Sequence, residues 1–503
     1  MIQYFLSDYS SCVLLLVISL AAFAFLRWKQ VTYSVFKAAN IPGPEPIPIF
    51  GNAWNIWKKV LPEYDQQLYQ KYGKIFGTFD GATPVINIAE PDIIRNIFVK
   101  DFDHFINRRN FSVKNRIFRK FITIAVDREW KAIRAAISPA FSSGKIKRMS
   151  VIMEECSRRL VSSLKESIAK GDGIFEAKNE FGTYTMDVIA SCCFGVDIKG
   201  EGENSSKFVD YASFLFGPNL TSSPLAIIPF ILPWLGRYTF GKMIKLKQWQ
   251  FFISITEALV KQRAHSNISY NDFIEMSLEA ASETAKKGLL NSEEVQEIVI
   301  AQSLLFFLAG YDTTGTTLTL TAYSLALNQK VQDKLREEVM NKLDENNGVL
   351  DHNVANSIEY IDQIINEVLR LYPPAIRVER LCNKAITYDK LHIPKGMIVN
   401  IPLYPLHRDP QYFPNPEKFD PDRFSPDRKR IIHPNAFMPF GSGPRNCVGM
   451  RFALEEIRLA LCAIIKEFRI ELSEKTEVPI TFPKGFSGLL QPRNVFLKLE
   501  LLE

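Results

Sequence analysis

The sequence has few cysteines and little net charge, and both argue against several classes of protein. Its seven cysteines are odd in number, thinly spread over 503 residues and never arranged as CxxC, so neither a zinc ribbon nor a thioredoxin-type site is supported. We therefore expect most of them to be reduced, buried thiols of a protein that faces the cytosol. The net charge is only 61 − 55 = +6, which permits contact with anionic lipid or an acidic protein but is too small to indicate nucleic-acid binding.

Long apolar runs and strand signals are scarce as well. The apolar runs are too few for a polytopic transporter, and strand-like runs occur at 75–79, 85–88, 398–401 and 495–499. Long amphipathic segments separate these runs, so we expect a mainly α fold with small β-sheets. Phenylalanine is abundant, at 37 residues, which predicts a core or pocket rich in aromatic rings.

One apolar run lies near the N-terminus. Residues 9–26 carry no charge, and a helix of eighteen residues reaches about 27 Å, just enough to span a bilayer core. Arg27 and Lys29 follow the run, and this positive flank predicts a cytosolic body with a lumenal N-terminus. The competing interpretation is a cleaved signal peptide, but no basic residue precedes Arg27. We predict a single N-terminal transmembrane helix within residues 1–29.

The rest of the chain divides into a hinge and one large domain. Residues 30–50 are polar and then proline-rich, and four prolines between residues 42 and 48 forbid a helix and hold the chain extended. Residues 51–503 form the large domain. Within it, residues 214–235 are apolar but interrupted by prolines. Short helices that dip into a membrane face and a buried hairpin explain this segment about equally well.

A long helix is predicted over residues 292–327, which contain no proline. Asn291 and Glu294 have the spacing of a capping box at its start. The middle of the helix, residues 309–317, holds two glycines and four threonines, which weaken a helix. Either a ligand that presses on the helix or a small-residue notch for another helix explains this weakness, and the segment taken alone favours the notch.

The most specific motif is the loop 440–449, Phe-Gly-Ser-Gly-Pro-Arg-Asn-Cys-Val-Gly, which has the form FxxGxRxCxG. A helix is predicted to start just after Cys447 and to run through Phe468. The thiol therefore lies at a helix N-terminus, where amide N–H groups and the helix dipole favour a thiolate. The glycines allow the backbone to approach a flat ligand closely.

This loop resembles the haem-binding loop of the cytochrome P450 superfamily, and the resemblance covers essentially the whole chain. It implies the cytochrome P450 fold, a haem b cofactor and Cys447 as the axial iron ligand. It also implies that Arg445 binds a haem propionate and that Phe440 packs near the thiolate. The details look most like the microsomal clan that holds vertebrate family 3 and several arthropod detoxification families.

A charged motif lies where that family requires it. Glu367 and Arg370 form an ExxR pair 80 residues before Cys447, and Arg423 matches the family's third arginine element. The resemblance implies that these three side chains form a buried structural network. The pattern alone is not specific, because residues 155–158 and 455–458 match it too and such pairs are usually solvated.

Two further segments match the family's haem pocket. Residues 309–314 fit its distal pattern (A/G)Gx(D/E)T(T/S), which implies that Thr313 lines the oxygen pocket and that Asp312 helps to deliver the protons that oxygen activation needs. Trp130 and Arg134 lie at i and i+4 on one helix face and match its propionate-binding helix.

Two more arginines enter as candidates for binding the haem propionates. Arg377, in the segment 375–380, is the first, and Arg108 is the second. Arg108 is equally well explained as a solvated residue.

The substrate site follows from the same resemblance. It is expected to draw on residues 102–124, on Leu305, Leu308 and Ala309 of the long helix, on residues 375–378 and on residues 486–489. Aromatic and aliphatic side chains dominate these segments, which favours a lipophilic substrate, although several of the rings are equally well explained as core.

The electrons must come from outside the chain, because it has no flavin or nicotinamide fingerprint. The resemblance implies NADPH–cytochrome P450 reductase, sometimes with cytochrome b5. A candidate docking face is basic, and solvated surface charge is its competing interpretation. Its members are Lys131, Lys145, Lys147, Arg148 and Arg451.

Together these features predict an enzyme anchored in the endoplasmic reticulum membrane with its catalytic domain in the cytosol. It would be a haem-thiolate monooxygenase that inserts one oxygen atom of O₂ into a lipophilic xenobiotic, steroid or fatty-acid-like molecule. One rival is a haem-thiolate isomerase or dehydratase acting on peroxides, against which the intact Asp312–Thr313 pair argues. The other is a non-catalytic membrane haem-binding protein, against which the full distal motif argues.

Overall fold

Helices make up most of the chain, as predicted. The computed structural model describes residues 2–110, 113, 115–195, 246–266, 268–485 and 488–502, together with positions 207, 210, 211, 214, 228–232 and 235. The longer helices are α1 (Ile2–Tyr33), α4 (Leu61–Tyr72), α7 (Asp127–Ile137), α8 (Ser143–Lys170), α9 (Ala177–Ile189), α14 (Lys247–His265), α15 (Phe273–Lys286), α16 (Ser292–Leu327), α17 (Gln329–Glu345), α19 (Glu359–Leu371) and α22 (Met450–Glu467).

Shorter helices connect these elements. They are α2 (Val35–Ala38), α3 (Ala53–Lys58), α5 (Pro91–Arg95), α6 (Arg116–Arg119), α12 (Ile228–Ile231), α18 (His352–Ser357), α20 (Leu403–Leu406) and α21 (Pro426–Lys429). Most of the apolar segment 214–235 lies outside the described residues, so neither interpretation of it is tested. Within it, α12 places Ile231 against Gly81, since a Cβ on Gly81 would come within 2.4 Å of the Ile231 carbonyl oxygen.

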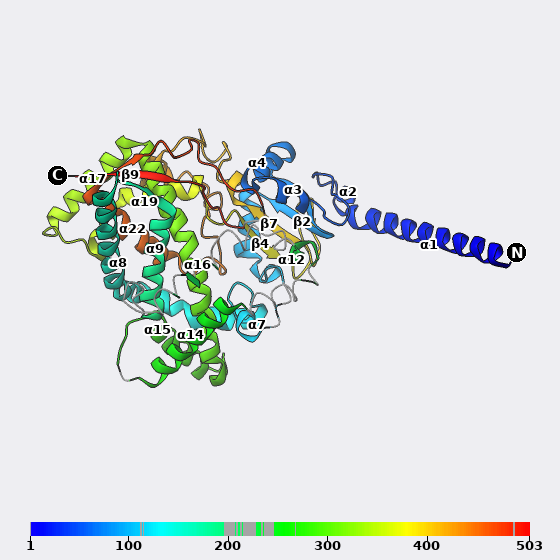
Figure 1. Cartoon of the computed structure of the whole chain (residues 1–503), viewed down its shortest axis with the longest axis horizontal. Coiled ribbons are helices and arrows are strands. Elements are labelled where there is room, and N and C mark those ends of the chain that lie inside the picture. Colours follow the sequence, from blue (N-terminus) through cyan, green and yellow to red (C-terminus); the bar gives the residue numbers. More distant parts are fainter. Residues whose placement is uncertain are drawn as a thin grey trace.

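Three small sheets accompany the helices. The largest has the order β1-β2-β7-β4, and in it β2 runs parallel to β7 with Val85 opposite Ile398. Its strands are β1 (Ile75–Asp80), β2 (Thr83–Ile88), β4 (Arg377–Leu381) and β7 (Ile398–Pro402). The second sheet joins β3 (Ile174–Glu176), β9 (Phe496–Leu501) and β8 (Phe468–Leu472), and the third pairs β5 (Ile386–Tyr388) with β6 (Leu391–Ile393). In Figure 1, β2, β4 and β7 lie with α3 and α4 at the end of the body from which α1 projects.

The four predicted strands are confirmed as β1, β2, β7 and β9, with β9 starting one residue later than predicted, but no sequence signal marked the other five. Three of those five are only three residues long, too short for an alternating pattern to emerge. Strand β4 carries three charged residues in five, and β8 follows α22 without a break. Their strand geometry comes from pairing with partners distant in sequence.

The N-terminal helix α1 contains the predicted apolar run and continues past residue 29 into the body. Tyr33 and Phe36 are buried, and both pack against Phe79 of β1 with ring centroids 4.9 and 5.1 Å away. The part of α1 that projects carries exposed apolar side chains. The large ones are Leu14, Leu16, Val17, Ile18, Leu20, Phe23, Phe25, Leu26, Trp28 and Val31.

Among the described residues, one helical segment is long and apolar enough to cross a membrane, and it is Glu293–Leu327 rather than α1. Of its most apolar stretch, 67% is buried inside the body. This is α16, which runs through the middle of the molecule in Figure 1. We therefore interpret it as a core helix, and the crossing of a membrane by α1 stays a prediction.

The proline-rich segment is extended as predicted, but it is more than a spacer. The Gly77 amide of β1 donates a hydrogen bond of 2.8 Å to the Pro42 carbonyl. A Cβ on Gly43 would lie 2.1 Å from the Gly77 carbonyl oxygen, so only glycine permits this approach. The hinge is therefore packed against the sheet and fixes how α1 leaves the body.

The long helix α16 begins and ends at the predicted residues, but only half of the capping box is formed. The Asn291 side chain makes no cap hydrogen bond. The Glu294 carboxylate accepts a hydrogen bond from the Asn291 backbone N–H, and it also pairs with the almost fully buried Lys120 at 2.6 Å. Both contacts lower the pKa of Glu294, the one with Lys120 more strongly. The same carboxylate thus serves the helix start and a tertiary ion pair.

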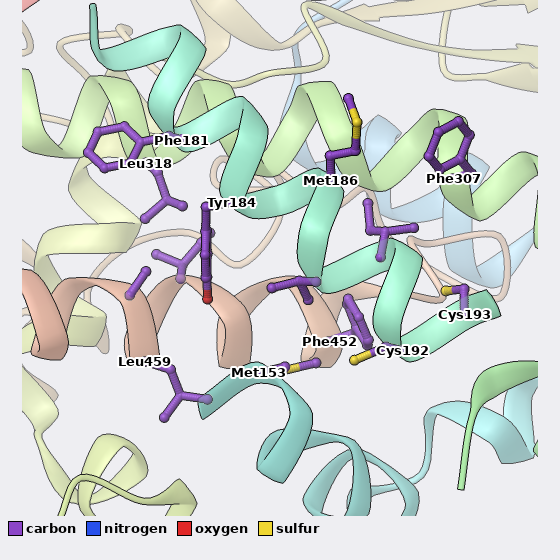
Figure 2. Packing of buried hydrophobic residues seen from close by; sticks show 14 of the residues in the cluster. Met153, Phe181, Tyr184, Met186, Cys192, Cys193, Phe307, Leu318, Phe452 and Leu459 are labelled. Atoms are coloured by element: carbon purple, nitrogen blue, oxygen red, sulfur yellow. The ribbon is translucent and has the colours of Figure 1, made fainter. Parts of the chain in front are cut away.

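The main core lies where α8, α9, α16 and α22 meet. Figure 2 shows α9, which carries Tyr184 and Met186, between α16 with Phe307 and α22 with Phe452, and Met153 of α8 belongs to the same cluster. All belong to one continuous cluster of buried apolar side chains. Helix α22 follows Cys447 directly, so this core fixes the position of the cysteine loop.

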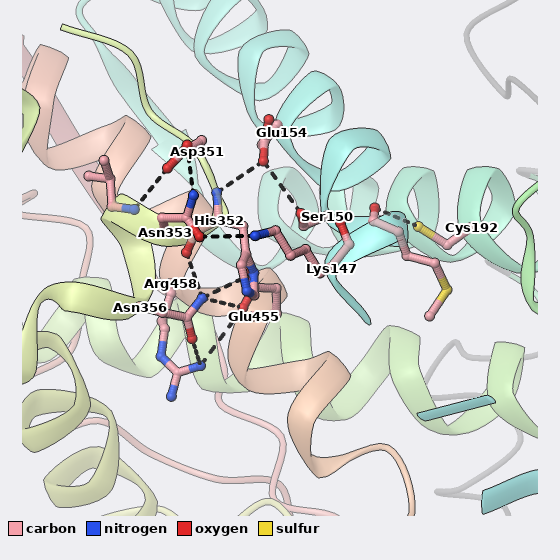
Figure 3. A network of polar contacts seen from close by, with 12 residues as sticks. Lys147, Ser150, Glu154, Cys192, Asp351, His352, Asn353, Asn356, Glu455 and Arg458 are labelled. Atoms are coloured by element: carbon pink, nitrogen blue, oxygen red, sulfur yellow. Dashed lines mark hydrogen bonds and ion pairs between the residues drawn. The ribbon is translucent and has the colours of Figure 1, made fainter. Parts of the chain in front are cut away.

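A polar network also ties α22 to its neighbours (Figure 3). The His352 Nδ1 atom lies 2.6 Å from a Glu455 carboxylate oxygen, and the Asn356 amide donates to the other oxygen at 2.7 Å. The His352 backbone N–H donates to Glu154 of α8 at 3.1 Å. The chance ExxR match at 455–458 is thus part of a link between α8, α18 and α22.

The ExxR network is confirmed. Two parallel hydrogen bonds of 2.7 and 2.8 Å join the Arg370 guanidinium to the Glu367 carboxylate, and neither side chain is exposed. The Arg423 Nε atom lies 3.5 Å from Glu367, and the Asp420 amide donates to the same carboxylate at 2.9 Å. The network therefore joins α19 to the loop that leads to the cysteine.

We expect Arg370→Leu to destabilise the fold by about 3–5 kcal/mol, because it leaves the Glu367 charge buried beside only the longer Arg423 contact. Urea unfolding measures this change. Arg158→Leu is the matched control, since the Glu155–Arg158 pair has the same spacing and a 2.8 Å contact but both side chains are exposed. Its effect should stay below about 1 kcal/mol. Equal losses in the two variants would contradict the structural role of the buried pair.

Candidate active site

A cavity of about 560 Å³ lies between α16, α7 and the loop that precedes α22. The described residues around it come from every segment in which a site residue was predicted. They include Ile122, Thr123, Trp130, Arg134, Leu305, Phe306, Ala309, Thr313, Ala375, Ile376, Arg377, Val378, Phe440, Arg445 and Cys447. The fold therefore brings together residues more than 300 positions apart in the chain.

The Cys447 loop is held by its own backbone. Gly443 has φ = +68°, and a Cβ on it would lie 1.8 Å from the Phe98 carbonyl oxygen, so no other residue fits. The Cys447 amide donates to the Phe440 carbonyl at 2.9 Å, and the Asn446 amide donates to the Gly443 carbonyl at 3.1 Å. These bonds curl the loop so that the thiol faces the cavity.

Cys447 is exposed and lines this cavity, although protein atoms surround its thiol on most sides. Burial raises the pKa of its thiol, while a hydrogen bond from the Gly449 amide and the charges of Arg134 and Arg108 lower it. The amide and the two guanidinium groups favour a thiolate, but burial prevails unless a further cation is present. A metal ion bound at the sulfur would supply that cation.

Several guanidinium groups around the cysteine lack anionic partners. Arg445 is almost fully buried, stacks over Trp130 at 4.8 Å and donates one N–H group to the Ala125 carbonyl. Its Nε and Nη1 atoms have no hydrogen-bond partner. Burial and the neighbouring charge of Arg108 lower its pKa to about 9.

Arg108 and Arg134 complete the group at the cavity. Arg108 donates to the Arg445 carbonyl at 3.4 Å, its Nε atom has no partner, and burial lowers its pKa. Arg134 donates to the backbone carbonyl and to the side-chain oxygen of Asn446, both at 2.8 Å. Within the described residues, none of these three arginines forms an ion pair with a carboxylate.

Arg377 is paired with a carboxylate of the protein, that of Asp65. Arg377 lines the cavity, but its guanidinium is bonded twice to the buried Asp65 carboxylate, once at 2.8 Å. This ion pair raises the pKa of Arg377 against the effect of burial. The Asp65 carboxylate engages its Nε and Nη2 atoms, so only the remaining N–H groups could reach a haem propionate, and the assignment of Arg377 stays a prediction.

Arg380 is a second arginine of β4 near the site that the sequence did not single out, and it does not line the cavity. It is fully buried, lies over the Phe98 ring at 4.2 Å, and leaves its Nε and Nη2 atoms without partners. Burial and the charges of Arg108 and Arg445 lower its pKa well below the ordinary value. Arg377 and Arg380 are three apart on β4, so alternation places them on opposite faces. The sequence does not tell which face meets the cysteine.

Unpartnered buried cations are costly, so this arrangement calls for an anionic ligand. Haem fits the requirement. Its two propionate carboxylates match the free N–H groups of Arg108 and Arg445, which line the cavity, and its iron matches the Cys447 thiolate. Phe440 and the indole of Trp130 add ring surface to the same cavity.

The centre of α16 serves two purposes on two faces. Ala309 and Thr313 face the cavity, and the Thr313 hydroxyl donates to the Ala309 carbonyl at 2.7 Å. A Cβ on Gly315 would lie 3.4 Å from the Gly182 Cα atom of α9, and one on Gly310 would lie 2.7 Å from Ile189 Cδ1. Both sequence-based explanations of this segment therefore hold, one for each face.

Asp312 turns away from the cavity. Its carboxylate pairs with Lys178 of α9 at 2.7 Å and accepts a hydrogen bond of 2.8 Å from the Gln491 amide. It is almost fully buried and is absent from the cavity wall, whereas its neighbour Thr313 is part of that wall. Any role of Asp312 in proton delivery must run through these partners.

The expected substrate wall is only partly the observed one. Phe105, Phe118 and Phe121 are buried in core clusters and are absent from the cavity wall, while Phe102 packs against Trp130 at 5.6 Å. Phe111, Phe486 and Ser487 lie outside the described residues. Rings that the sequence did not single out line the cavity instead, namely Phe141, Phe273 and Phe306. They come from α15, α16 and the turn after α7.

Comparison with known proteins gives a consistent result. The family model described as "Cytochrome P450" matches residues 41–499. A protein named lithocholate 6-beta-hydroxylase from Mesocricetus auratus is 38% identical over 482 residues, which cover 93% of each chain. Cytochrome P450 3A16 from Mus musculus is 38% identical over 93% of this chain and 92% of its own. Cytochrome P450 3A2 from Rattus norvegicus is 38% identical over 92% and 91%.

We expect Gly443→Ala to abolish haem retention, because the new Cβ collides with the Phe98 backbone and a positive φ disfavours alanine. Haem content per protein, measured by absorbance after purification, reports the effect. Gly144→Ala is the control, since a Cβ there meets nothing within 4 Å and the position lies in the first turn of α8. Its stability should be unchanged or raised by up to about 1 kcal/mol. Full haem content in Gly443→Ala would contradict the close approach.

Proposed function

Because the chain belongs to the cytochrome P450 family and is a cytochrome P450 monooxygenase, we propose that it hydroxylates lipophilic small molecules at a membrane. One oxygen atom of O₂ enters the substrate and the other is reduced to water. The electrons come from NADPH through NADPH–cytochrome P450 reductase, with cytochrome b5 as an optional second donor. The observation that carries the proposal is that the Cys447 thiol and Thr313 line one cavity edged by unpartnered buried arginines.

The cofactor in this proposal is haem b, with its iron ligated by Cys447. When bound, it supplies an iron centre whose thiolate ligand favours cleavage of the O–O bond. Arg108, Arg134 and Arg445 hold its propionates. Arg377 lines the same cavity and remains a candidate for this role, while its ion pair with Asp65 also anchors β4 to α4.

Two residues of α16 handle protons. The Thr313 hydroxyl faces the cavity and can orient a water there while it keeps its bond to the Ala309 carbonyl. Asp312 lies on the other face, where the side chain of Lys178 is 24% exposed. Protons from solvent therefore reach Asp312 along the Lys178 side, and Thr313 places them at the distal side of the cavity.

The cavity wall favours an apolar substrate. Leu305, Phe306, Ile122 and Val378 present hydrocarbon to it, and each apolar contact contributes by removing surface from water. The name of one relative refers to a hydroxylase of lithocholate, a steroid acid. A xenobiotic, a steroid or a fatty-acid-like molecule fits such a wall.

The same proposal places the enzyme in the endoplasmic reticulum membrane. Helix α1 projects from the body with exposed apolar side chains, which suits a single-pass anchor (Figure 1). Arg27 and Lys29 put the body on the cytosolic side. Lys131, Lys147, Arg148 and Arg451 are exposed and Lys145 is partly exposed, so they remain candidates for an encounter with an acidic reductase surface.

An isotope experiment separates this proposal from its rivals. The protein is reconstituted in lipid with NADPH–cytochrome P450 reductase, ¹⁸O₂ and a panel of lipophilic substrates, and products are analysed by mass spectrometry. A product that carries one ¹⁸O and requires NADPH is expected. An unlabelled product formed without NADPH would establish an isomerase or dehydratase instead.

Thr313→Ala should uncouple electron use from hydroxylation. We expect product per NADPH consumed to fall about tenfold or more while hydrogen peroxide rises, because the water that carries protons loses its anchor. Thr321→Ala is the matched control on α16. Its hydroxyl makes the same 2.7 Å bond to the carbonyl four residues earlier, but it is buried away from the cavity. Equal coupling in both variants would remove Thr313 from the mechanism.

Arg380→Met and Arg377→Met should act in opposite directions on the protein without haem. Arg380→Met removes a buried charge that has no carboxylate partner, so the apoprotein keeps or gains stability. Arg377→Met strands the Asp65 carboxylate, so the apoprotein loses about 3–5 kcal/mol. Urea unfolding of the apoproteins measures both effects. A loss of apoprotein stability in Arg380→Met would contradict the unpaired state of this charge.

A further inference from the structure

A second cleft lies on the outer side of the loop that walls the catalytic cavity. It measures about 720 Å³ and opens between the loop 119–126, α7 and the start of α16. It shares no lining residue with the catalytic cavity. Ile122 and Thr123 face the catalytic cavity, whereas Ile124, Ala125 and Val126 line the second cleft. One short stretch of chain therefore separates the two spaces.

The lining of the second cleft combines hydrocarbon with one uncompensated positive charge. Its apolar side chains are Val113, Ile124, Val126, Ile133, Leu289, Leu290 and Ile298. Leu289 is 59% exposed, so a ligand that covers its side chain removes apolar surface from water, which favours binding. The three cations and two carboxylates give a net charge of 3 − 2 = +1.

The two carboxylates are already engaged. Glu294 lies 2.6 Å from Lys120, and Glu129 lies 3.7 Å from Arg119. The remaining cation is Arg128, which is exposed and, in the part of the chain that the structure describes, has no hydrogen bond or ion pair. A guanidinium in that state suits a carboxylate or a sulfate.

We propose that this cleft binds an amphipathic organic monoanion, with its acidic group on Arg128 and its apolar body along Leu289, Leu290 and Ile133. Its volume lies within the range of small-molecule sites in proteins. The catalytic cavity takes the substrate, so the ligand of the second cleft is an effector.

The loop 120–125 couples the two sites. The Gln302 side chain of α16 accepts a hydrogen bond from the Ile122 amide at 3.1 Å and donates one of 2.6 Å to the Lys120 carbonyl. Arg445 donates to the Ala125 carbonyl from the other side. A ligand against Ile124 and Ala125 therefore acts on the wall that carries Ile122 and on a carbonyl that holds Arg445. The effector role rests on the proposed function, whereas binding itself does not.

Equilibrium dialysis of radiolabelled decanoate against the haem-loaded protein tests binding. A saturating azole that ligates the haem fills the catalytic cavity and blocks decanoate there. We expect one equivalent of decanoate to remain bound in the presence of the azole, and decanol, which lacks the charge, to bind about tenfold more weakly. Complete displacement of decanoate by the azole would overturn the second site.

Variants locate the site. Arg128→Ala should weaken the azole-insensitive binding about tenfold, and Leu289→Ser should weaken it severalfold. The matched controls are Arg430→Ala and Val349→Ser, which change an exposed arginine and an exposed apolar residue outside the cleft and should bind like the unmodified protein. Unchanged binding in Arg128→Ala would overturn the assignment of the acidic group.

Coupling is measured by the absorption change that a neutral steroid causes at the haem. Saturating decanoate should change the Kd of the steroid about fivefold or more, and Arg128→Ala should abolish this effect. An unchanged Kd beside confirmed binding would overturn the effector role. None of these measurements requires turnover, so they stand apart from the isotope experiment on the monooxygenase proposal.

Discussion

The site depends on buried positive charge that the protein itself does not neutralise. Arg108 and Arg445 line the cavity with Cys447, Arg380 lies next to these two arginines, and each of the three leaves N–H groups without partners. Burial and the charges of neighbouring arginines lower the pKa values of all three. Burying these unpaired charges lowers the stability of the folded chain. A dianionic group such as haem offsets that loss when it binds, so binding of the cofactor and stability of the fold are linked.

Elsewhere in the scaffold, buried charges are paired. Glu367 pairs with Arg370, and Asp65 pairs with Arg377. These pairs fix the loop before Cys447 and strand β4. Fully paired buried charges contribute rigidity, whereas unpaired ones reserve affinity for a ligand. The same residue type thus has opposite roles on the two faces of β4.

The sequence was informative where a motif ties chemistry to a short stretch of chain. The Cys447 loop, the long helix with Thr313, the ExxR pair and four strands were all predicted, because local spacing encodes them. Residues whose role depends on pairing across the fold were missed or misassigned. Arg377 and Arg380 differ in pairing because Asp65, more than 300 residues away, meets only Arg377. The Glu294 carboxylate keeps its contact with the Asn291 backbone but gains a partner, Lys120, that local spacing does not reveal.

The centre of α16 shows why the sequence of residues 309–317 allowed two explanations. A helix that crosses a domain beside a flat ligand must be small where it meets the ligand and small where it meets its neighbour. Ala309 and Thr313 satisfy the first need, Gly315 satisfies the second, and Gly310 lines the cavity and also approaches Ile189. Each glycine costs the helix about 1 kcal/mol, and close packing against α9 offsets this cost. The low helix propensity of residues 309–317 therefore reflects two contacts at once. Only the structure shows which residues of the segment face the cavity and which pack against α9.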